Sequence, residues 1–313
     1  MTTDPTGEQM QEGVRVTAPY GREIIPQLDC LLAVESPIRR GWEFSREGLV
    51  RFRKSLGKLE SLDQFETIGV SGSYARMEAG EGSDFDLIAI YKEDADPELL
   101  VKAERELKDR IAECGLRTPS GKGIFAVPIC RGELFAASLG QIDESPKSFG
   151  IRIQLLLDGQ PVWQEERFQN LQRDVLRRYL TPVPGAERTA CWNYLVHDLA
   201  RYFRSLALKY QWEDREQFPR WSLRNVKGGF SRPLMQVALL TLLGESLAEG
   251  RDPESWVAAR LHLTPLERLV AALPSGREKP LQEIASAYGD FLQTISMSQI
   301  RNGMSEMEFL ELR

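Results

Sequence analysis

The sequence predicts an α+β protein in which a small mixed-sheet domain is followed by an all-helical domain. Up to about residue 180, short apolar runs that suit strands alternate with segments of helical periodicity. Beyond the Pro- and Gly-rich break Thr181-Pro182-Val183-Pro184-Gly185, every periodic segment has helical spacing. The chain of 313 residues is long enough for two domains. We expect a flexible terminus over residues 1–20, a sheet domain over 21–180 and a helical domain over 186–313.

The individual elements follow from local patterns. Helices are expected over Trp42–Leu59 and from Pro97 to near Gly115, on either side of two apolar runs joined by a short loop. Short strands are expected around Leu116 and over Ile124–Ile129. Of the later segments, Ser148–Leu157 fits either a strand or a helix and Pro161–Leu180 reads as a charged helix. The remaining helical segments are Arg188–Tyr210, Leu234–Leu247, Trp256–Leu273 and Leu281–Ser296.

Composition excludes several classes of function. The net charge of −6 and the pI of about 5.3 give no global basic field. This argues against long nucleic acid as a partner and leaves a tRNA end open. The four cysteines and two histidines are widely spaced, which does not suit a zinc site. We find no signal peptide and no apolar run of membrane-spanning length, and expect a cytoplasmic protein that does not bind a membrane.

The most informative local feature is a pair of carboxylates at the head of a predicted strand. Asp84 and Asp86 precede the apolar run Leu87–Ile90, so on a strand they point to the same face. Two like charges there are unfavourable unless a cation lies between them, and Mg²⁺ prefers carboxylate and phosphate oxygens. Gly72 and Ser73, which end the preceding apolar run, offer backbone N–H groups and a hydroxyl to a phosphate.

The two halves of this motif resemble the nucleotidyltransferase superfamily, which includes DNA polymerase β and the kanamycin nucleotidyltransferases. The fuller pattern, Gly72-Ser73-Tyr74-Ala75-Arg76-x-Glu78 with Gly82-Ser83-Asp84-x-Asp86-Leu87, looks most like the protein PII uridylyltransferase-type branch and its uncharacterised bacterial relatives. The segments Ile151–Trp163 and Trp221–Leu234 are more weakly similar. The resemblance implies that residues 21–180 form the nucleotidyltransferase domain and that the helical domain closes the nucleotide cleft.

The resemblance also implies roles for single residues. Asp84 and Asp86 would be catalytic and bind Mg²⁺ (or Mn²⁺), and Gly72 and Ser73 would hold a phosphate of a nucleoside triphosphate (NTP). The superfamily uses a third carboxylate on a neighbouring strand, yet no Asp or Glu lies between residues 115 and 132. The candidates are Glu113, Glu133 and Asp143. Glu113 is favoured because Glu113-Cys114-Gly115-Leu116 resembles an Asp-x-Gly-Leu segment of the uridylyltransferases, and one or two metals remain possible.

Three basic residues are further candidates for phosphate binding. Arg76 lies in the loop and either reaches a triphosphate oxygen or forms an ion pair that stiffens the loop, for example with Glu78. Arg224 and Lys227 are three residues apart on a predicted helix and share a face. They either bind a triphosphate or form a solvated basic surface.

Two functions are consistent with these features. The first is a Mg²⁺-dependent, ATP- or other NTP-using nucleotidyltransferase that places a nucleoside monophosphate on an acceptor and releases pyrophosphate. The acceptor, whether a protein side chain, a small metabolite or a second nucleotide, is unknown, and so is the base of the NTP. The second is a catalytically inactive nucleotide-binding sensor of the same fold. Pyrophosphate release distinguishes the two.

Overall fold

The computed structural model describes residues 17–119, 123–125, 127–140, 144–180, 192–214, 218–273 and 276–296. Within them a four-stranded mixed sheet has the order β3-β2-β1-β4, which confirms the mixed sheet expected from the sequence. β1 is antiparallel to both β2 and β4, and β2 is parallel to β3. The strands are β1 (Phe65–Ser71), β2 (Asp86–Tyr91), β3 (Ile129–Cys130) and β4 (Gln160–Trp163).

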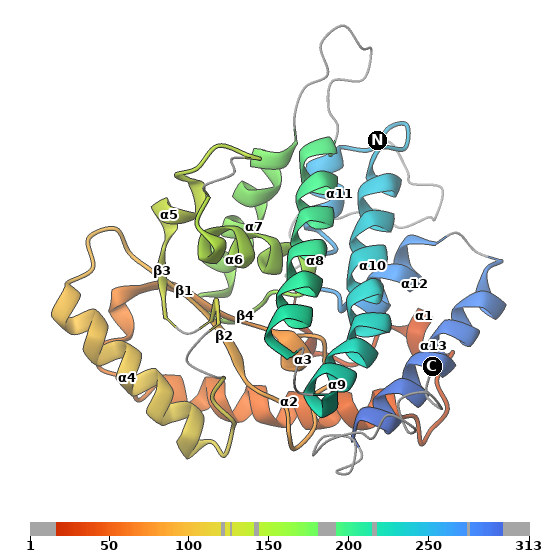
Figure 1. Cartoon of the computed structure of the whole chain (residues 1–313), viewed down its shortest axis with the longest axis horizontal. Helices are drawn as coiled ribbons and strands as arrows, with labels where there is room; N and C mark the ends of the chain where they lie inside the picture. The colour runs from red at the N-terminus through yellow and green to blue at the C-terminus, as the bar shows by residue number, and fades with distance from the viewer. Residues whose placement is uncertain are drawn as a thin grey trace, which may run out of the picture.

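Helices surround this sheet and make up every regular element described after residue 192 (Figure 1). The helices of the first part are η1 (Pro19–Gly21), α1 (Pro26–Asp29), α2 (Pro37–Leu56), η2 (Leu62–Gln64), α3 (Gly72–Ala75), α4 (Pro97–Glu113), α5 (Arg131–Phe135), α6 (Pro146–Leu157) and α7 (Glu165–Tyr179). Those of the second part are α8 (Asn193–Asp214), α9 (Phe218–Gly229), α10 (Ser231–Ser246), α11 (Pro253–Ala258), α12 (Pro265–Ala272) and α13 (Glu278–Ser296). None of these described helices is both long and apolar enough to cross a membrane.

Both faces of the sheet are apolar. Because a strand is pleated, successive side chains belong to opposite faces. Ile68 of β1 and Ala89 of β2 belong to the hydrophobic cluster that includes α2 and α4. Ile88 and Ile90 belong to the other cluster, with α6 and α7. Gly69 lies on this second face, and a Cβ there would overlap the ring of Phe168 on α7. Glycine at this position therefore lets α7 approach the strand.

Both hydrophobic clusters draw residues from the sheet region and from the helices after residue 192. The first contains Phe52 of α2 together with Leu266 of α12 and Phe291 of α13. The second contains Leu171 of α7 together with Leu239 of α10. The boundary expected at residues 181–185 lies outside the described residues, so the division into domains stays a prediction.

Several local expectations were wrong or only partly right. Residues 161–163, expected at the start of a charged helix, lie in β4 instead, because the backbone of this segment pairs with β1. Ser148–Leu157, which fitted either type, lies in α6. Around Leu116 the chain forms no strand, but Arg117 makes a single β-bridge with Asp84. In the described part of Ile124–Ile129, only Ile129 is in a strand. The helix expected over Trp256–Leu273 is interrupted between α11 and α12, where Thr264 begins the second helix through a capping box.

Candidate functional site

The turn after β1 brings the Gly-Ser segment against the Asp pair. The register of β1 and β2 places Ser71 opposite Asp86. Gly72 follows with a φ of +73°, and a Cβ at this position would lie 2.4 Å from Oδ2 of Asp86. Both the backbone conformation and the space therefore require glycine. As a result, the Asp86 carboxylate lies directly beside the backbone of the turn.

Asp158, at the end of α6, fixes this turn from the opposite side. Its carboxylate is buried. Oδ1 lies 2.6 Å from Oγ of Ser71, and Oδ2 accepts hydrogen bonds from the backbone N–H of Gly72 at 3.1 Å and from Nη1 of Arg76 at 2.6 Å. Sequence reasoning missed Asp158. The available signal was an Asp-Gly pair directly after the apolar helix, within the segment that is weakly similar to the superfamily.

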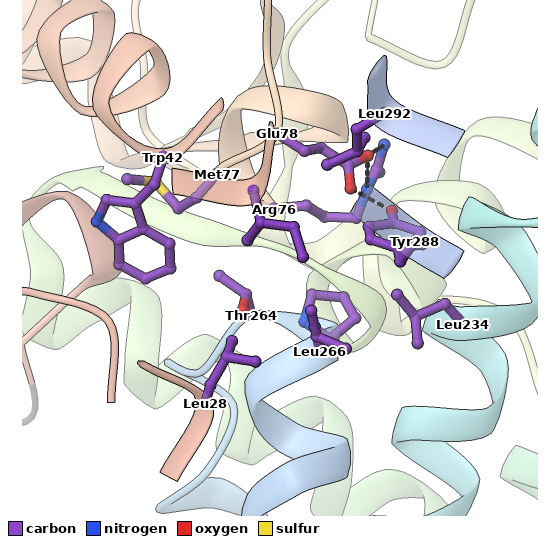
Figure 2. A pocket seen from close by; sticks show the side chains of 12 residues that line it. Leu28, Trp42, Arg76, Met77, Glu78, Leu234, Thr264, Leu266, Tyr288 and Leu292 are labelled. Carbon is purple, nitrogen blue, oxygen red and sulfur yellow. Dashed lines mark hydrogen bonds and ion pairs between the residues drawn. The ribbon is translucent and has the colours of Figure 1, made fainter. Parts of the chain in front are cut away.

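Arg76 forms a nearly buried network with two carboxylates, that of Glu78 in the same loop and that of Asp158 after α6. Besides Asp158, its guanidinium donates from Nε to Oε1 of Glu78 at 2.6 Å. The other oxygen of Glu78 accepts a hydrogen bond from the hydroxyl of Tyr288 on α13, and Figure 2 shows these side chains converging beside a cavity of about 20 Å³. Of the two interpretations of Arg76, the ion pair with Glu78 is present in the structure. Contact with a phosphate stays a prediction.

Asp86 is the unbalanced charge of the site. Burial, followed by the nearby charges of Asp84 and Asp158, raises its pKa from 3.8 to about 7, while Arg76 and Lys227 oppose this shift. No hydrogen bond or ion pair joins the Asp86 carboxylate to any other described residue. A partly buried carboxylate next to other carboxylates and without a partner has the properties of a cation ligand.

Asp84 is more exposed and has a cationic neighbour. Its Oδ1 lies 3.0 Å from Nε of Arg117, and the backbone N–H of Phe85 donates to the Arg117 carbonyl at 2.8 Å. The side chain of Asp84 is 45% exposed, so the ion pair with Arg117 contributes little stability. Arg117 thus stands next to the Asp pair, on the segment where the sequence analysis looked for a third carboxylate.

The candidates for that third carboxylate have other contacts. Glu113, at the exposed end of α4, forms an ion pair with Arg110. Glu133 accepts hydrogen bonds from the hydroxyl of Tyr91 and the backbone N–H of Cys130. Asp143 lies outside the described residues. Within the described ranges no group of three or more His, Cys, Asp or Glu residues is arranged to hold a metal, and the role of Glu113 stays a prediction.

A set of basic side chains faces the site from the later helices. Lys227 on α9 acts electrostatically on Asp86. Arg224 on the same helix and Arg232 on α10 both stack on the ring of Tyr210, with their guanidinium carbons 4.2 Å and 4.5 Å from the ring centroid. Lys227 is therefore near enough to Asp86 to act on its charge. Arg224 forms an ion pair with Glu213 at 3.1 Å and contacts Arg232, and its contact with a phosphate stays a prediction.

Arg232 is the second residue that sequence reasoning did not single out. Burial, together with the positive charges of Arg76 and Arg224, lowers its pKa. Among the described residues its hydrogen bond goes to a neutral group, the carbonyl oxygen of Arg224, at 3.4 Å. A partly buried guanidinium that lies near other cations favours an anion in its surroundings. The sequence signal was its place in Trp221–Leu234, the segment that is weakly similar to the superfamily.

Comparison with known proteins agrees with this geometry. Residues 50–120 match the family model of the nucleotidyltransferase domain, a range that contains β1, the Gly-Ser turn and the Asp pair. The match supports the nucleotidyltransferase superfamily and nucleotidyl transfer as the general class of reaction. No curated protein matches the sequence. The similarity to the uridylyltransferase branch stays a prediction.

Proposed function

We propose that the protein is a Mg²⁺-dependent nucleotidyltransferase that transfers a nucleoside monophosphate from an NTP to an acceptor and releases pyrophosphate. The observation that carries this proposal is the Asp86 carboxylate, which has a raised pKa, no hydrogen-bond partner among the described residues, and Gly72 in direct contact. The carboxylates of Asp84 and Asp86 fit a divalent cation, since the charge of Asp84 raises the energy of ionised Asp86.

The reaction joins an acceptor oxygen to the α-phosphorus of the NTP and breaks the bond from that phosphorus to the oxygen of the β-phosphate, which leaves with pyrophosphate. The acceptor loses one proton. A bound Mg²⁺ would supply charge neutralisation between the phosphates and the Asp pair. We assign binding of the triphosphate to the hydroxyl of Ser73 and to the basic residues Lys227 and Arg232, whose fixed charges need no reorganisation during reaction. The backbone N–H of Gly72, which the sequence also suggested for this role, donates to Asp158 instead.

Release of pyrophosphate tests this assignment. Purified protein is incubated with each of the four NTPs, with Mg²⁺ or Mn²⁺, in the presence of a cell lysate depleted of small molecules and in its absence. We expect pyrophosphate from at least one NTP and a loss of about 100-fold or more in Asp86→Asn. Asp109→Asn is the matched control, because Asp109 is an exposed aspartate on α4.

Asp86→Asn also separates loss of chemistry from loss of fold. Because Asp86 is an unfavourable charge without a cation, the variant is expected to melt at the same or a higher temperature than the native protein in chelator at pH 8. Near-native turnover in Asp86→Asn would contradict the metal assignment.

A nucleotide-binding sensor is the second candidate. One observation favours it: the Asp158 carboxylate accepts hydrogen bonds from Ser71, Gly72 and Arg76, so a buried carboxylate beside the Gly-Ser turn acts as a scaffold rather than as a metal ligand. Binding of an NTP without pyrophosphate release under every condition above would support the sensor and contradict the enzyme.

A further inference from the structure

Tyr288 of α13 is a buried tyrosine whose hydroxyl meets two other segments of the chain. One segment is the loop that follows the Gly-Ser turn, and the other is the start of α10. Figure 2 shows Tyr288 together with Glu78 of the loop and Leu234 of α10, and all three line the same small cavity. The helix α13 therefore joins two segments that are far apart in the sequence.

The first contact leads from Tyr288 to the Gly-Ser turn. The Tyr288 hydroxyl donates to Oε2 of Glu78, and Oε1 of Glu78 accepts from Nε of Arg76 at 2.6 Å. Nη1 of Arg76 donates to Asp158, which accepts the backbone N–H of Gly72. The Glu78 side chain is only 7% exposed, so water replaces a lost donor poorly. Without the Tyr288 hydroxyl, Oε2 of Glu78 would therefore compete with Asp158 for the guanidinium of Arg76.

The second contact leads from Tyr288 to the corner between α9 and α10. The side chain of Ser231, the first residue of α10, forms a hydrogen bond with the Tyr288 hydroxyl. One turn further along α13, the ring of Phe291 lies 5.4 Å from that of Tyr288 and stacks on Phe230, with centroids 4.8 Å apart. Phe230 and Ser231 separate the two basic residues that we assign to the triphosphate. The corner that carries these basic residues is therefore packed against α13.

We propose that Tyr288 is a positioning residue that holds the Gly-Ser turn and the corner between α9 and α10 at a fixed separation. This inference rests on the proposed function, because that function places the triphosphate between these two segments. Tyr288 acts through Glu78 and Ser231 and needs no contact with the nucleotide. Phosphate binding depends on such fixed geometry, since charge-assisted hydrogen bonds weaken when donors are displaced by about 1 Å.

The variant Tyr288→Phe removes the hydroxyl and keeps the ring, and Tyr179→Phe is its matched control. Tyr179 is also buried, and its hydroxyl donates to the carboxylate of Asp198 at 2.7 Å, in a network that contains neither Glu78 nor Arg76. Both variants should lose a similar amount of stability in thermal melting, because each loses a buried hydroxyl that is bonded to a carboxylate. A difference in substrate binding between the two variants therefore reports positioning.

Hydrogen exchange without nucleotide tests the junction itself. In Tyr288→Phe, the amides of residues 72–79 and those of residues 228–235 should both exchange about threefold faster than in the native protein, or more. Tyr179→Phe should leave both segments as they are. Unchanged exchange in either segment of Tyr288→Phe would overturn the proposal, and so would equally fast exchange in Tyr179→Phe.

Pyrophosphate release gives the second measurement. Tyr288→Phe should raise KM for the NTP about fivefold and change kcat by less than about twofold, because the phosphate contacts of the bound substrate are weakened. Tyr179→Phe should keep the native KM. A native KM in Tyr288→Phe would overturn the positioning role. If the native protein releases no pyrophosphate, the proposed function fails, while the exchange of the free protein still decides whether Tyr288 holds the two segments together.

Discussion

Arg76 and Asp158 form an ion pair of 2.6 Å in which the Asp158 side chain is fully buried and that of Arg76 is 13% exposed. The pair joins the loop after β1 to the end of α6, which is 82 residues away in the sequence. Asp158 also accepts the hydrogen bond from the backbone N–H of Gly72. The shape of the Gly-Ser turn therefore depends on a charge that belongs to another part of the chain.

We expect that replacing either Arg76 or Asp158 lowers the free energy of unfolding and that the two effects are not additive. Asp158→Asn and Arg76→Met each leave a buried charge with fewer partners, which destabilises by roughly 3 kcal/mol. The double variant should lose less than the sum of the single variants, because no uncompensated charge of this pair remains. Urea unfolding of the four proteins measures the coupling. Additive effects would mean that the two side chains do not stabilise each other.

Replacement of Gly72 by alanine tests the contact between the turn and Asp86. The positive φ alone is expected to lower the free energy of unfolding by about 1 kcal/mol. The overlap of the new Cβ with Asp86 Oδ2 lowers it further. Gly250 is the matched control, because its φ is +80° and a Cβ there meets nothing within 4 Å. Gly72→Ala should therefore destabilise more than Gly250→Ala in urea unfolding and should also reduce pyrophosphate release. Equal destabilisation would contradict the close approach of Asp86.

The assignment of Arg232 to the triphosphate predicts a selective effect on substrate binding. Arg232→Met should raise KM for the NTP about tenfold, since one charge-assisted contact to a phosphate is lost. Arg204→Met on α8 removes an exposed arginine and should leave KM unchanged. Hydrogen exchange gives a second measurement: amides around residues 224–232 should be protected by NTP and Mg²⁺. Protection confined to residues 72–86 would contradict a contact between nucleotide and the later helices.

His262 makes the folded state sensitive to acid. Burial, followed by the positive charge of Arg22, lowers its pKa from 6.5 to about 4, although Glu267 opposes the shift and Arg268 adds to it. Between pH 4 and pH 6.5 the unfolded chain binds more protons than the folded one. The stability that the neutral ring of His262 contributes is therefore fully present above pH 6.5 and is lost as the pH falls towards 4. The loss amounts to about 2–3 kcal/mol.

The variant His262→Gln removes this titration. Its free energy of unfolding should fall less between pH 7 and pH 4.5 than that of the native protein, as measured by urea unfolding at each pH. The exposed histidine on α8, His197, provides the control: His197→Gln should follow the native curve. If the two variants show the same pH dependence, His262 is not the source of the sensitivity.

The parts of the site that could be predicted from sequence are those set by local pattern. The Gly-Ser turn, the Asp pair and the strands on either side lie within one short segment, and the alternation of apolar residues fixes which side chains share a face. The role of Asp158 does not follow from local pattern, since its partners Ser71, Gly72 and Arg76 lie 87, 86 and 82 residues away in the sequence. The assignment of residues 161–163 to a helix failed for a related reason, because a short edge strand is defined by its partner rather than by its own periodicity.

Both hydrophobic clusters contain residues of the sheet region and of the later helices, and this limits which sequence changes either region can accept. Phe52 and Leu266 belong to one cluster, and Leu171 and Leu239 to the other. A hybrid that joined the first 180 residues to the helices of another protein would have to match side-chain shapes across two separate interiors at once. We therefore expect the two regions to be inherited as a unit, with substitutions in one compensated by substitutions in the other.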